Sequence, residues 1–192
     1  MMAEMYQPLS TVYLASGSPR RRFLLESCGL VVKRLEQDAD ETWPSMPLGD
    51  AMEELARRKM AAVKVALQGP TVAADTAVIL DDKALGKPAD TQEAIETLTL
   101  LAGRAHTVAS GVCVADGQSL ASFHVLTKVW FRPLTAYEIA SYVGLGESMD
   151  KAGAYGIQGH GASLVERVEG SYTNVVGLPV AETLAALRVL AS

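Results

Sequence analysis

The sequence has little of what several protein classes require. Its two cysteines, Cys28 and Cys113, lie in apolar runs and lack the spacing of metal ligands, so we expect two buried free thiols in a reducing compartment. No run of about 18 apolar residues occurs, which excludes a membrane-spanning helix. The first ten residues contain no basic stretch followed by a long apolar one. We therefore expect no signal peptide and a cytoplasmic location.

Positive charge is also scarce. The chain has 17 Lys and Arg against 22 Asp and Glu, a net charge of −5. A general nucleic-acid binder needs a basic surface, so we expect no nucleic-acid partner. A local cluster of cations can still hold a small polyanionic molecule in an acidic protein. With 49% hydrophobic and 20% charged residues, the 192-residue chain has the composition of a globular protein.

Common catalytic and nucleotide-binding signatures are absent as well. The chain has no GxxxxGK[ST] phosphate loop, no GxGxxG loop and no legible Ser-His-Asp arrangement. The three histidines, His106, His124 and His160, are not spaced as a metal triad. His106 precedes a β-run, and we expect it to be a structural, hydrogen-bonding histidine.

The residues that are present predict an α/β fold with a mixed sheet. Strands are expected over residues 11–15, 30–35, 71–80, 105–115, 119–131 and 164–168. Helices are expected over residues 19–28, 51–67, 91–102, 135–143 and 179–190. Asp50 is the expected cap of the second helix, and Asp116-Gly117 is a strong hairpin signal. We expect one domain over residues 1–192, with two lobes sharing one sheet and a frayed end at residues 1–10.

The first chemical motif is residues 16–22, with the sequence SGSPRRR. Pro19 is expected to open a helix with Ser18 as its N-cap, which places three arginines in the first turn. Each exposed cation there is unfavourable by about 0.3–1 kcal/mol, because the helix dipole is positive at this end. Free N–H groups, guanidinium groups and the small Ser16 and Gly17 together favour a phosphate site. The alternative is a solvated basic turn after a strand.

Asp75 and Lys87 are the next candidates. Asp75 lies in a strand of small and β-branched residues, where a carboxylate is costly unless it is paired, metal-bound or catalytic. The alternative is an aspartate at a strand end or edge that hydrogen-bonds its neighbours. Lys87 lies in a Gly-Lys-Pro turn, where it is either a solvent-exposed lysine or a clamp for a nearby phosphate.

A glycine-rich segment covers residues 151–162. It also carries Ile, Tyr and neighbouring charged residues, which a merely flexible loop would not need. This composition suggests a backbone that lies close to a ligand or to another chain. Gln158 within it has both a donor and an acceptor, so this side chain suits the recognition of a base edge.

Five sequence blocks occur together and in order: residues 14–21 (LASGSPRR), 73–76 (AADT), 86–88 (GKP), 150–159 (DKAGAYGIQG) and 170–179 (GSYTNVVGLP). On these blocks the chain resembles the Maf family over nearly its whole length. The resemblance implies a fold akin to inosine triphosphate pyrophosphatases, with an elongated, twisted mixed sheet, flanking helices and a cleft between two lobes. It also implies cleavage of a nucleoside triphosphate to the monophosphate and pyrophosphate with a divalent metal, Mg²⁺ or Mn²⁺, with Co²⁺ as a further candidate.

Three positions are similar to one branch of the family. Arg20, Thr76 and Gln158 match the branch that acts on dTTP and UTP, whereas a second branch, acting on 7-methyl-GTP, has Trp, Gln and Glu in these places. The implied substrates are therefore dTTP and UTP, with modified pyrimidine nucleotides as further candidates. The ten-residue lead before Thr11, and Leu164 where the family more often has Phe, depart from the pattern without touching the inferred chemistry.

The resemblance also implies roles for individual residues. Asp75 matches the proton acceptor of the family, and Lys87 matches the lysine of its Gly-Lys-Pro turn. Ser16, Arg20 and Arg21 match positions that bind the substrate, the two arginines through its phosphates.

Glu41 and Lys59 look like two further catalytic positions, in a stretch whose length varies within the family. Glu41 and Asp75 are the implied metal ligands, and a homodimer is a further expectation from the family. The competing hypothesis is a nucleotide-binding regulator of cell division or septum formation with little turnover. Such a regulator would keep the arginines, but it would not need Asp75 and Glu41 to be placed as metal ligands.

Overall fold

A computed structural model describes residues 11–190; the predicted frayed end, residues 1–10, lies outside the described residues, as do residues 191–192. The strands are β1 (Thr11–Leu14), β2 (Val31–Arg34), β3 (Thr71–Leu80), β4 (Lys83–Leu85), β5 (Ala105–Asp116), β6 (Ser119–Phe131) and β7 (Val165–Glu169). The helices are α1 (Pro19–Glu26), α2 (Leu48–Ala61), α3 (Thr91–Leu101), α4 (Ala136–Gly144), α5 (Tyr172–Val176) and α6 (Val180–Leu190), with 3-10 helices η2 (Ala152–Ala154) and η3 (Gly159–Leu164). None of the helices in the described range is long and apolar enough to cross a membrane.

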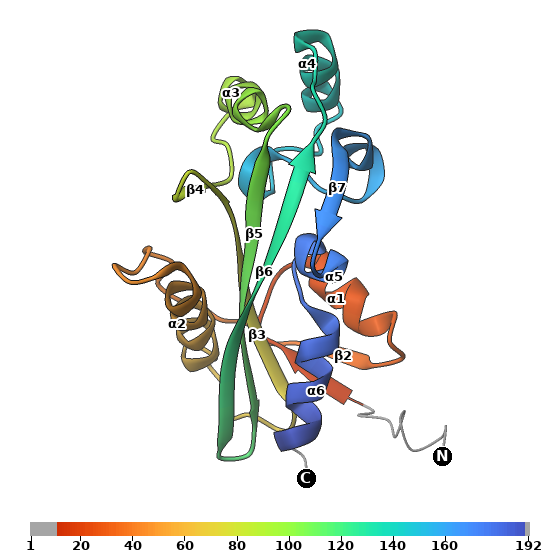
Figure 1. Ribbon diagram of the computed structural model, residues 1–192. Coiled ribbons are helices and arrows are strands. Elements are labelled where there is room, and N and C mark those ends of the chain that lie inside the picture. The colour runs from red at the N-terminus through yellow and green to blue at the C-terminus, as the bar shows by residue number, and fades with distance from the viewer. Residues whose placement is uncertain (1–10, 191–192) are drawn as a thin grey trace. The chain divides into compact units, whose positions relative to one another are not determined.

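The strands form one seven-stranded mixed sheet, as predicted. Their order is β2-β1-β3-β5-β6-β7, with β4 paired to β3 (Figure 1). β1 pairs in parallel with β2 and with β3, whereas the β3–β4 and β6–β7 pairs are antiparallel. The predicted hairpin turn is confirmed, since β5 ends at Asp116 and Gly117 has φ of 57° in the left-handed region that glycine favours.

The chain divides into two compact units. The first unit contains the residues up to Asp75, Gly111–His124 and the residues from Gly177 onward. The second unit contains Thr76–Ser110 and Val125–Val176. β3, β5 and β6 therefore contribute residues to both units, and the boundary within β3 falls between Asp75 and Thr76. The cleft expected between two lobes stays a prediction.

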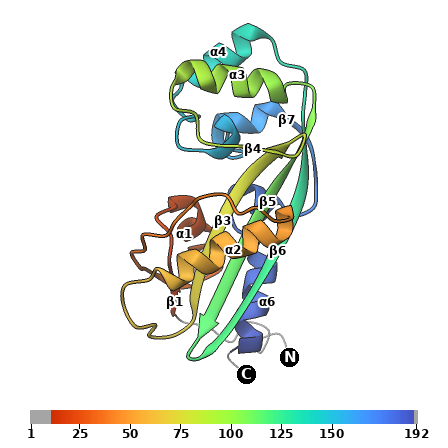
Figure 2. The ribbon, with the colours of Figure 1, turned by 90° about the vertical axis from the view of Figure 1, so that its left-hand side faces the viewer.

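In the first unit, helices cover both faces of the sheet. α2 lies on one face and α6 on the other (Figures 1 and 2). α2 approaches β5 so closely that a Cβ atom at Gly111 would lie 1.9 Å from the carbonyl oxygen of Met52. The core between α2 and the sheet consists mainly of small side chains; its buried residues are Ala15, Ala56, Met60, Ala73, Cys113 and Ala115, of which Ala56 and Met60 belong to α2. Such close packing brings the side chains of α2 directly over the strands.

In the second unit, α3 packs beside α4, and both helices begin as predicted. Asp90 accepts a hydrogen bond from the backbone N–H of Glu93, and Thr135 forms a complete capping box with Glu138. The expectation of a structural His106 is confirmed. Its ring is buried against Phe131 and Tyr155, with Nε2 2.7 Å from the Tyr155 hydroxyl oxygen. Burial lowers the pKa of His106 to about 4.

Three local expectations were wrong. The second helix covers Leu48–Ala61 rather than 51–67, because Val63 pairs with Gln37 in a β-bridge and residues beyond Ala61 leave the helix. Its N-cap is Pro47, and Asp50 instead lies in the first turn, where its charge still suits the helix dipole. Cys113 is buried, but Cys28 is exposed; it lies beyond the end of α1, which ends at Glu26.

Candidate active site

The loop between β1 and α1 is ordered by its own serines. Ser18 caps α1 and accepts a hydrogen bond from the backbone N–H of Arg21 at 3.4 Å, as the N-cap prediction requires. The backbone N–H of Ser18 donates to Oγ of Ser16 at 3.2 Å. Because Leu14, the last residue of β1, pairs with Val72 of β3, this loop leaves β1 beside the start of β3.

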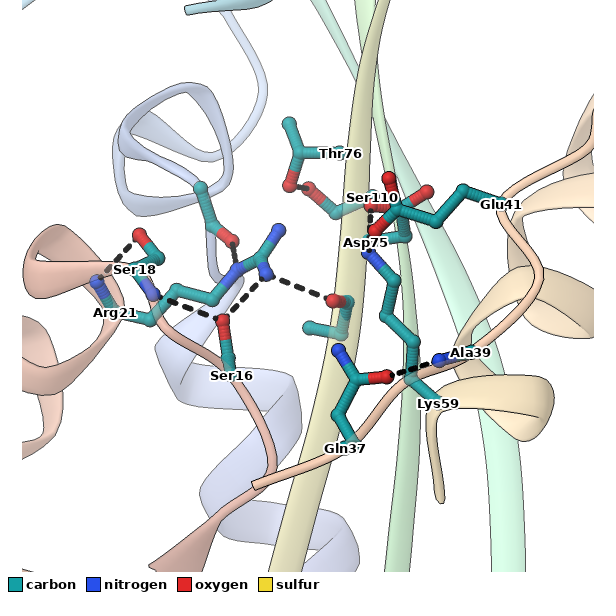
Figure 3. A network of polar contacts seen from close by, with 12 residues as sticks. Ser16, Ser18, Arg21, Gln37, Ala39, Glu41, Lys59, Asp75, Thr76 and Ser110 are labelled. Carbon is teal, nitrogen blue, oxygen red and sulfur yellow. Dashed lines mark hydrogen bonds and ion pairs between the residues drawn. The ribbon is translucent and has the colours of Figure 1, made fainter. Parts of the chain in front are cut away.

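Arg21 is buried and binds three parts of the first unit (Figure 3). Its Nε donates to the carbonyl oxygen of Gly177 at 2.8 Å. Its Nη1 donates to Oγ of Ser16 at 2.9 Å and to the carbonyl oxygen of Ala74 at 2.8 Å. Burial lowers the pKa of the Arg21 guanidinium below its ordinary value, and the carboxylate of Asp75 opposes that shift. A guanidinium stays protonated under any ordinary condition, so Arg21 places a fixed positive charge beside Asp75.

The three arginines of the motif have different surroundings. Arg20 is half-buried, and its charge lies close enough to Arg21 to contribute to the lowered pKa of Arg21. Arg22 is exposed and forms an ion pair with Glu26 one helical turn later, at 2.7 Å. Arg20 and Arg21 therefore share one neighbourhood, whereas Arg22 is engaged on the surface of α1.

Lys59 connects the two predicted carboxylates. Its Nζ lies 2.7 Å from Oδ1 of Asp75 and 2.8 Å from Oε1 of Glu41 (Figure 3). The side chain of Lys59 is 8% exposed, that of Asp75 22% and that of Glu41 64%. A lysine this deeply buried requires compensation of its charge, and the two carboxylates supply it. Oδ2 of Asp75 has no hydrogen-bond partner among residues 11–190.

The position of Lys59 follows from the apolar face of α2. Leu55, Ala56 and Met60 are buried on that face, and Lys59 follows Leu55 by four residues, so it lies on the same side of the helix. The face of α2 that packs on the sheet thus carries one cation, Lys59. It lies in the last turn of the helix, where a positive charge is stabilised by the helix dipole. Asp75 lies in β3, and only Asp75 and Thr76 in this strand are not buried.

The donor set limits which metal could bind. Among residues 11–190 no group of three or more His, Cys, Asp and Glu side chains is placed to hold a metal ion. Glu41 and Asp75 supply two carboxylates, and both bind the same lysine nitrogen. Mg²⁺ commonly takes one or two protein carboxylates and completes its shell with water and substrate phosphates. The two carboxylates fit such an ion, and they do not fit a metal that needs a full set of protein ligands.

The remaining predicted residues lie in the second unit. Thr76 Oγ1 lies 2.8 Å from Oγ of Ser110. Lys87 is exposed, Gln158 is half-buried, and no hydrogen bond within the described part of the chain joins either to another predicted residue. The Gly-Lys-Pro turn is nevertheless attached to the glycine-rich segment, because the backbone N–H of Gly153 donates to the carbonyl oxygen of Gly86 at 3.0 Å.

The structure thus brings six predicted residues together in the first unit, namely Ser16, Arg20, Arg21, Glu41, Lys59 and Asp75. Sequence reasoning missed the Gly177 carbonyl oxygen, which binds Arg21 from 156 residues away. It also missed Ser110, the buried partner of Thr76. A lone serine in the apolar run of β5 was the signal that could have found Ser110.

Comparisons with known proteins extend over almost the whole chain. The family described as Maf-like protein matches residues 11–190. A protein of Nitratidesulfovibrio vulgaris named dTTP/UTP pyrophosphatase is 49% identical over 183 residues, covering 92% of this chain and 86% of that protein. A protein of the same name from Pelotomaculum thermopropionicum is 46% identical, covering 90% of this chain and 93% of that protein. Another, from Escherichia coli O157:H7, is 43% identical, covering 91% and 90%.

Proposed function

The chain belongs to the Maf family, and from this premise we propose that it hydrolyses dTTP and UTP to the nucleoside monophosphate and pyrophosphate. The observation that carries the proposal is the Glu41–Lys59–Asp75 arrangement beside the buried charge of Arg21. Two carboxylates and two cations in one neighbourhood suit a reaction that moves negative charge between phosphate oxygens.

The substrate phosphates would bind at the loop between β1 and α1. Arg20 and Arg21 supply the positive charge, and Ser16 shapes the loop through its hydrogen bonds to Arg21 and to Ser18. Arg21 donates hydrogen bonds to the carbonyl oxygens of Ala74 and Gly177, and these bonds fix the orientation of its guanidinium group before the substrate binds. A cation held in place before the substrate binds needs no reorganisation during the reaction, and this is the source of electrostatic catalysis.

The chemical step is a displacement at the α-phosphorus. A water oxygen forms a bond to this phosphorus while the bond to the oxygen that bridges the α- and β-phosphates breaks. The bridging oxygen keeps the electron pair and leaves as part of pyrophosphate. Asp75 accepts the proton of the attacking water, and Lys59 holds Oδ1 of Asp75 so that Oδ2 is available for this transfer.

Glu41 and Asp75 would hold the divalent ion. When bound, the ion would neutralise charge on the phosphate oxygens as the negative charge of the leaving group develops. Because Glu41 is the more exposed of the two carboxylates, it can adjust its position to an incoming ion and nucleotide at a smaller loss of packing. Lys59 pairs with both carboxylates and offsets one of their two negative charges, so a divalent ion would have to compete with the lysine for them.

Nucleotide selection is assigned to residues of the second unit and to Arg20. Thr76 and Gln158 offer hydroxyl and amide groups that can pair with the polar edge of a pyrimidine, and Lys87 offers a point charge for a phosphate. The homodimer and the cytoplasmic location expected from the sequence stay predictions alongside these roles.

Pyrophosphate release across a panel of nucleotides tests the proposal. With Mg²⁺ or Mn²⁺ present, we expect turnover of dTTP and UTP and little turnover of dATP, GTP or 7-methyl-GTP. A preference for 7-methyl-GTP would keep the reaction but contradict the assignment of Arg20, Thr76 and Gln158 to pyrimidine selection. The absence of turnover with every nucleotide would contradict the enzyme and favour the nucleotide-binding regulator.

Replacing Lys59 by methionine tests the coupling between the two carboxylates. The variant loses the cation that binds both Glu41 and Asp75 but keeps a long apolar side chain in the same packing. We expect turnover to fall by about 10²-fold or more, the scale of removing one pre-organised electrostatic group. We also expect Mn²⁺ to bind more tightly without nucleotide, because two carboxylates then share no cation. Loss of the free-Mn²⁺ signal in electron paramagnetic resonance measures the binding.

The matched control is the same substitution at the exposed Lys64, which should change neither quantity. Unchanged Mn²⁺ affinity in the Lys59→Met protein would show that the two carboxylates do not act together toward a cation.

A further inference from the structure

Arg34 is a cation without a counter-charge at the end of β2. Its side chain is exposed, and it forms no hydrogen bond or ion pair with any residue in the range 11–190. The exposed Arg22 and Arg104, in contrast, each form an ion pair with a carboxylate, at 2.7 Å and 2.8 Å. The described part of the chain therefore leaves the charge of Arg34 available to a ligand.

The sheet fixes the place from which the Arg34 side chain starts. Arg34 is the last residue of β2 and pairs in parallel register with Leu14, the last residue of β1 (Figure 1). The backbone N–H of Leu35 donates to the carbonyl oxygen of Leu14 at 2.9 Å, which continues this pairing by one residue. The carboxyl ends of β1 and β2 thus lie at the same edge of the sheet, where ligands commonly bind in α/β proteins.

The guanidinium group of Arg34 lies beside the loop between β1 and α1. A Cβ atom at Gly17 would lie 3.4 Å from Nη2 of Arg34 and 3.8 Å from its Cζ. α1, which follows this loop and carries Arg20 and Arg21, also packs against β2. A guanidinium group has N–H donors and no acceptor, so it can only donate toward an anion. Arg34 therefore brings a third guanidinium group to the loop at which the proposed function places the substrate phosphates.

The position of Arg34 in the sheet indicates which phosphates it would contact. The proposed function places the α-phosphorus at Asp75 in β3, and β1 lies between β3 and β2. Neighbouring strands are about 4.8 Å apart, so the strand of Arg34 lies roughly 10 Å across the sheet from that of Asp75. A guanidinium group at this distance suits the phosphates beyond the α-phosphate, since it pairs with phosphate oxygens rather than with an uncharged base.

We propose that Arg34 is a further substrate-binding residue, which donates hydrogen bonds to the β- and γ-phosphates that leave together as pyrophosphate. This inference rests on the proposed function. It assigns Arg20 and Arg21 to the loop side of the triphosphate and Arg34 to its far end.

The test uses the two products of the reaction as separate probes. Isothermal titration calorimetry in the presence of Mg²⁺ measures the binding of pyrophosphate and, in a parallel titration, of UMP. Arg34→Gln removes the charge at an exposed position, so the fold should be retained. We expect pyrophosphate to bind about tenfold more weakly, the lower end of the range for a hydrogen bond to a charged group, and UMP to bind as it does to the wild type. The kcat/KM for UTP should fall by a similar factor, because UTP carries the same two phosphates.

Lys33→Gln is the matched control. Lys33 precedes Arg34 in β2 and is also exposed, but it lies on the opposite face of the strand, with its Nζ 5.7 Å from the centroid of the Tyr13 ring. This variant changes the net charge equally and should bind pyrophosphate as the wild type does. Equal weakening in the two variants would show an effect of net charge alone and would overturn the inference. Unchanged pyrophosphate binding in Arg34→Gln would overturn it as well, and so would an equal loss for UMP, which lacks the leaving phosphates.

The binding of pyrophosphate does not depend on turnover. Wild-type protein that binds pyrophosphate but hydrolyses neither dTTP nor UTP would contradict the proposed function, and the titration of Arg34→Gln would still decide whether Arg34 binds phosphate. Wild-type protein that hydrolyses UTP with the same kcat/KM and pyrophosphate affinity as Arg34→Gln would keep the proposed function and overturn only the role of Arg34. Wild-type protein that binds no pyrophosphate would overturn that role too.

Discussion

Replacing Asp75 by asparagine is expected to lower turnover of dTTP by at least about 10²-fold, which is the contribution of a positioned general base. Asparagine has nearly the same shape as aspartate, but its amide cannot accept a proton from the attacking water. Lys59 keeps its ion pair with Glu41 at 2.8 Å, so the substitution does not leave a buried cation without compensation. Steady-state pyrophosphate release measures the loss, and the thermal midpoint verifies that the variant is folded.

The control for this experiment is the same substitution at Asp81. This carboxylate is exposed and forms an ion pair with Arg104 at 2.8 Å, which contributes at most about 1 kcal/mol to stability at such a site. Asp81→Asn should therefore retain the activity of the wild type. Near-normal turnover in Asp75→Asn would contradict the assignment of Asp75 as the proton acceptor.

Replacing Gly111 by alanine is expected to lower the free energy of unfolding by at least about 3 kcal/mol, at the upper end of the range for overpacking. The added Cβ would lie 1.9 Å from the carbonyl oxygen of Met52 and 2.8 Å from the backbone nitrogen of Glu53. Both atoms belong to the backbone of α2, so no change of side-chain rotamer relieves the clash. The helix must move away from β5, and Lys59 moves with it, so we expect activity to fall too.

Urea denaturation with linear extrapolation measures the effect on stability. Gly144→Ala is the matched control, because a Cβ at Gly144 meets no atom within 4 Å. Gly144 ends α4, where alanine has the higher helix propensity, so this variant should be as stable as the wild type or slightly more stable. A Gly111→Ala protein within about 0.5 kcal/mol of the wild type, the range of neutral surface changes, would show that α2 is not tightly seated on β5.

The elements that the sequence predicted well are those whose signals are local. Ser18 and Pro19 start α1, Asp90 starts α3, and Thr135 with Glu138 starts α4, each through contacts within one turn of the chain. The end of α2 was predicted six residues too late for the opposite reason. Val63 continues the apolar periodicity of the helix, but in the structure it pairs with Gln37 in a β-bridge. A helical pattern of apolar residues gives no information about such a long-range partner.

For the site, the sequence alone indicated which residues are candidates for the chemistry. Arginines in the first turn of a helix and a carboxylate inside a strand destabilise the fold unless they bind a ligand or a partner residue. This destabilisation can be inferred from the sequence alone. The order of the five motif blocks further indicated the family, to which the chain does belong.

Only the tertiary structure decided which of these groups meet. Lys59 binds both Glu41 and Asp75, because the apolar face of α2 packs on the sheet and carries the lysine with it. Arg21 binds a carbonyl group 156 residues away, and Ser110 binds Thr76 across 34 residues. Such pairings depend on strand order and on the seating of helices, which arise from the burial of many side chains together. Local sequence specifies the available groups, and long-range packing specifies their partners.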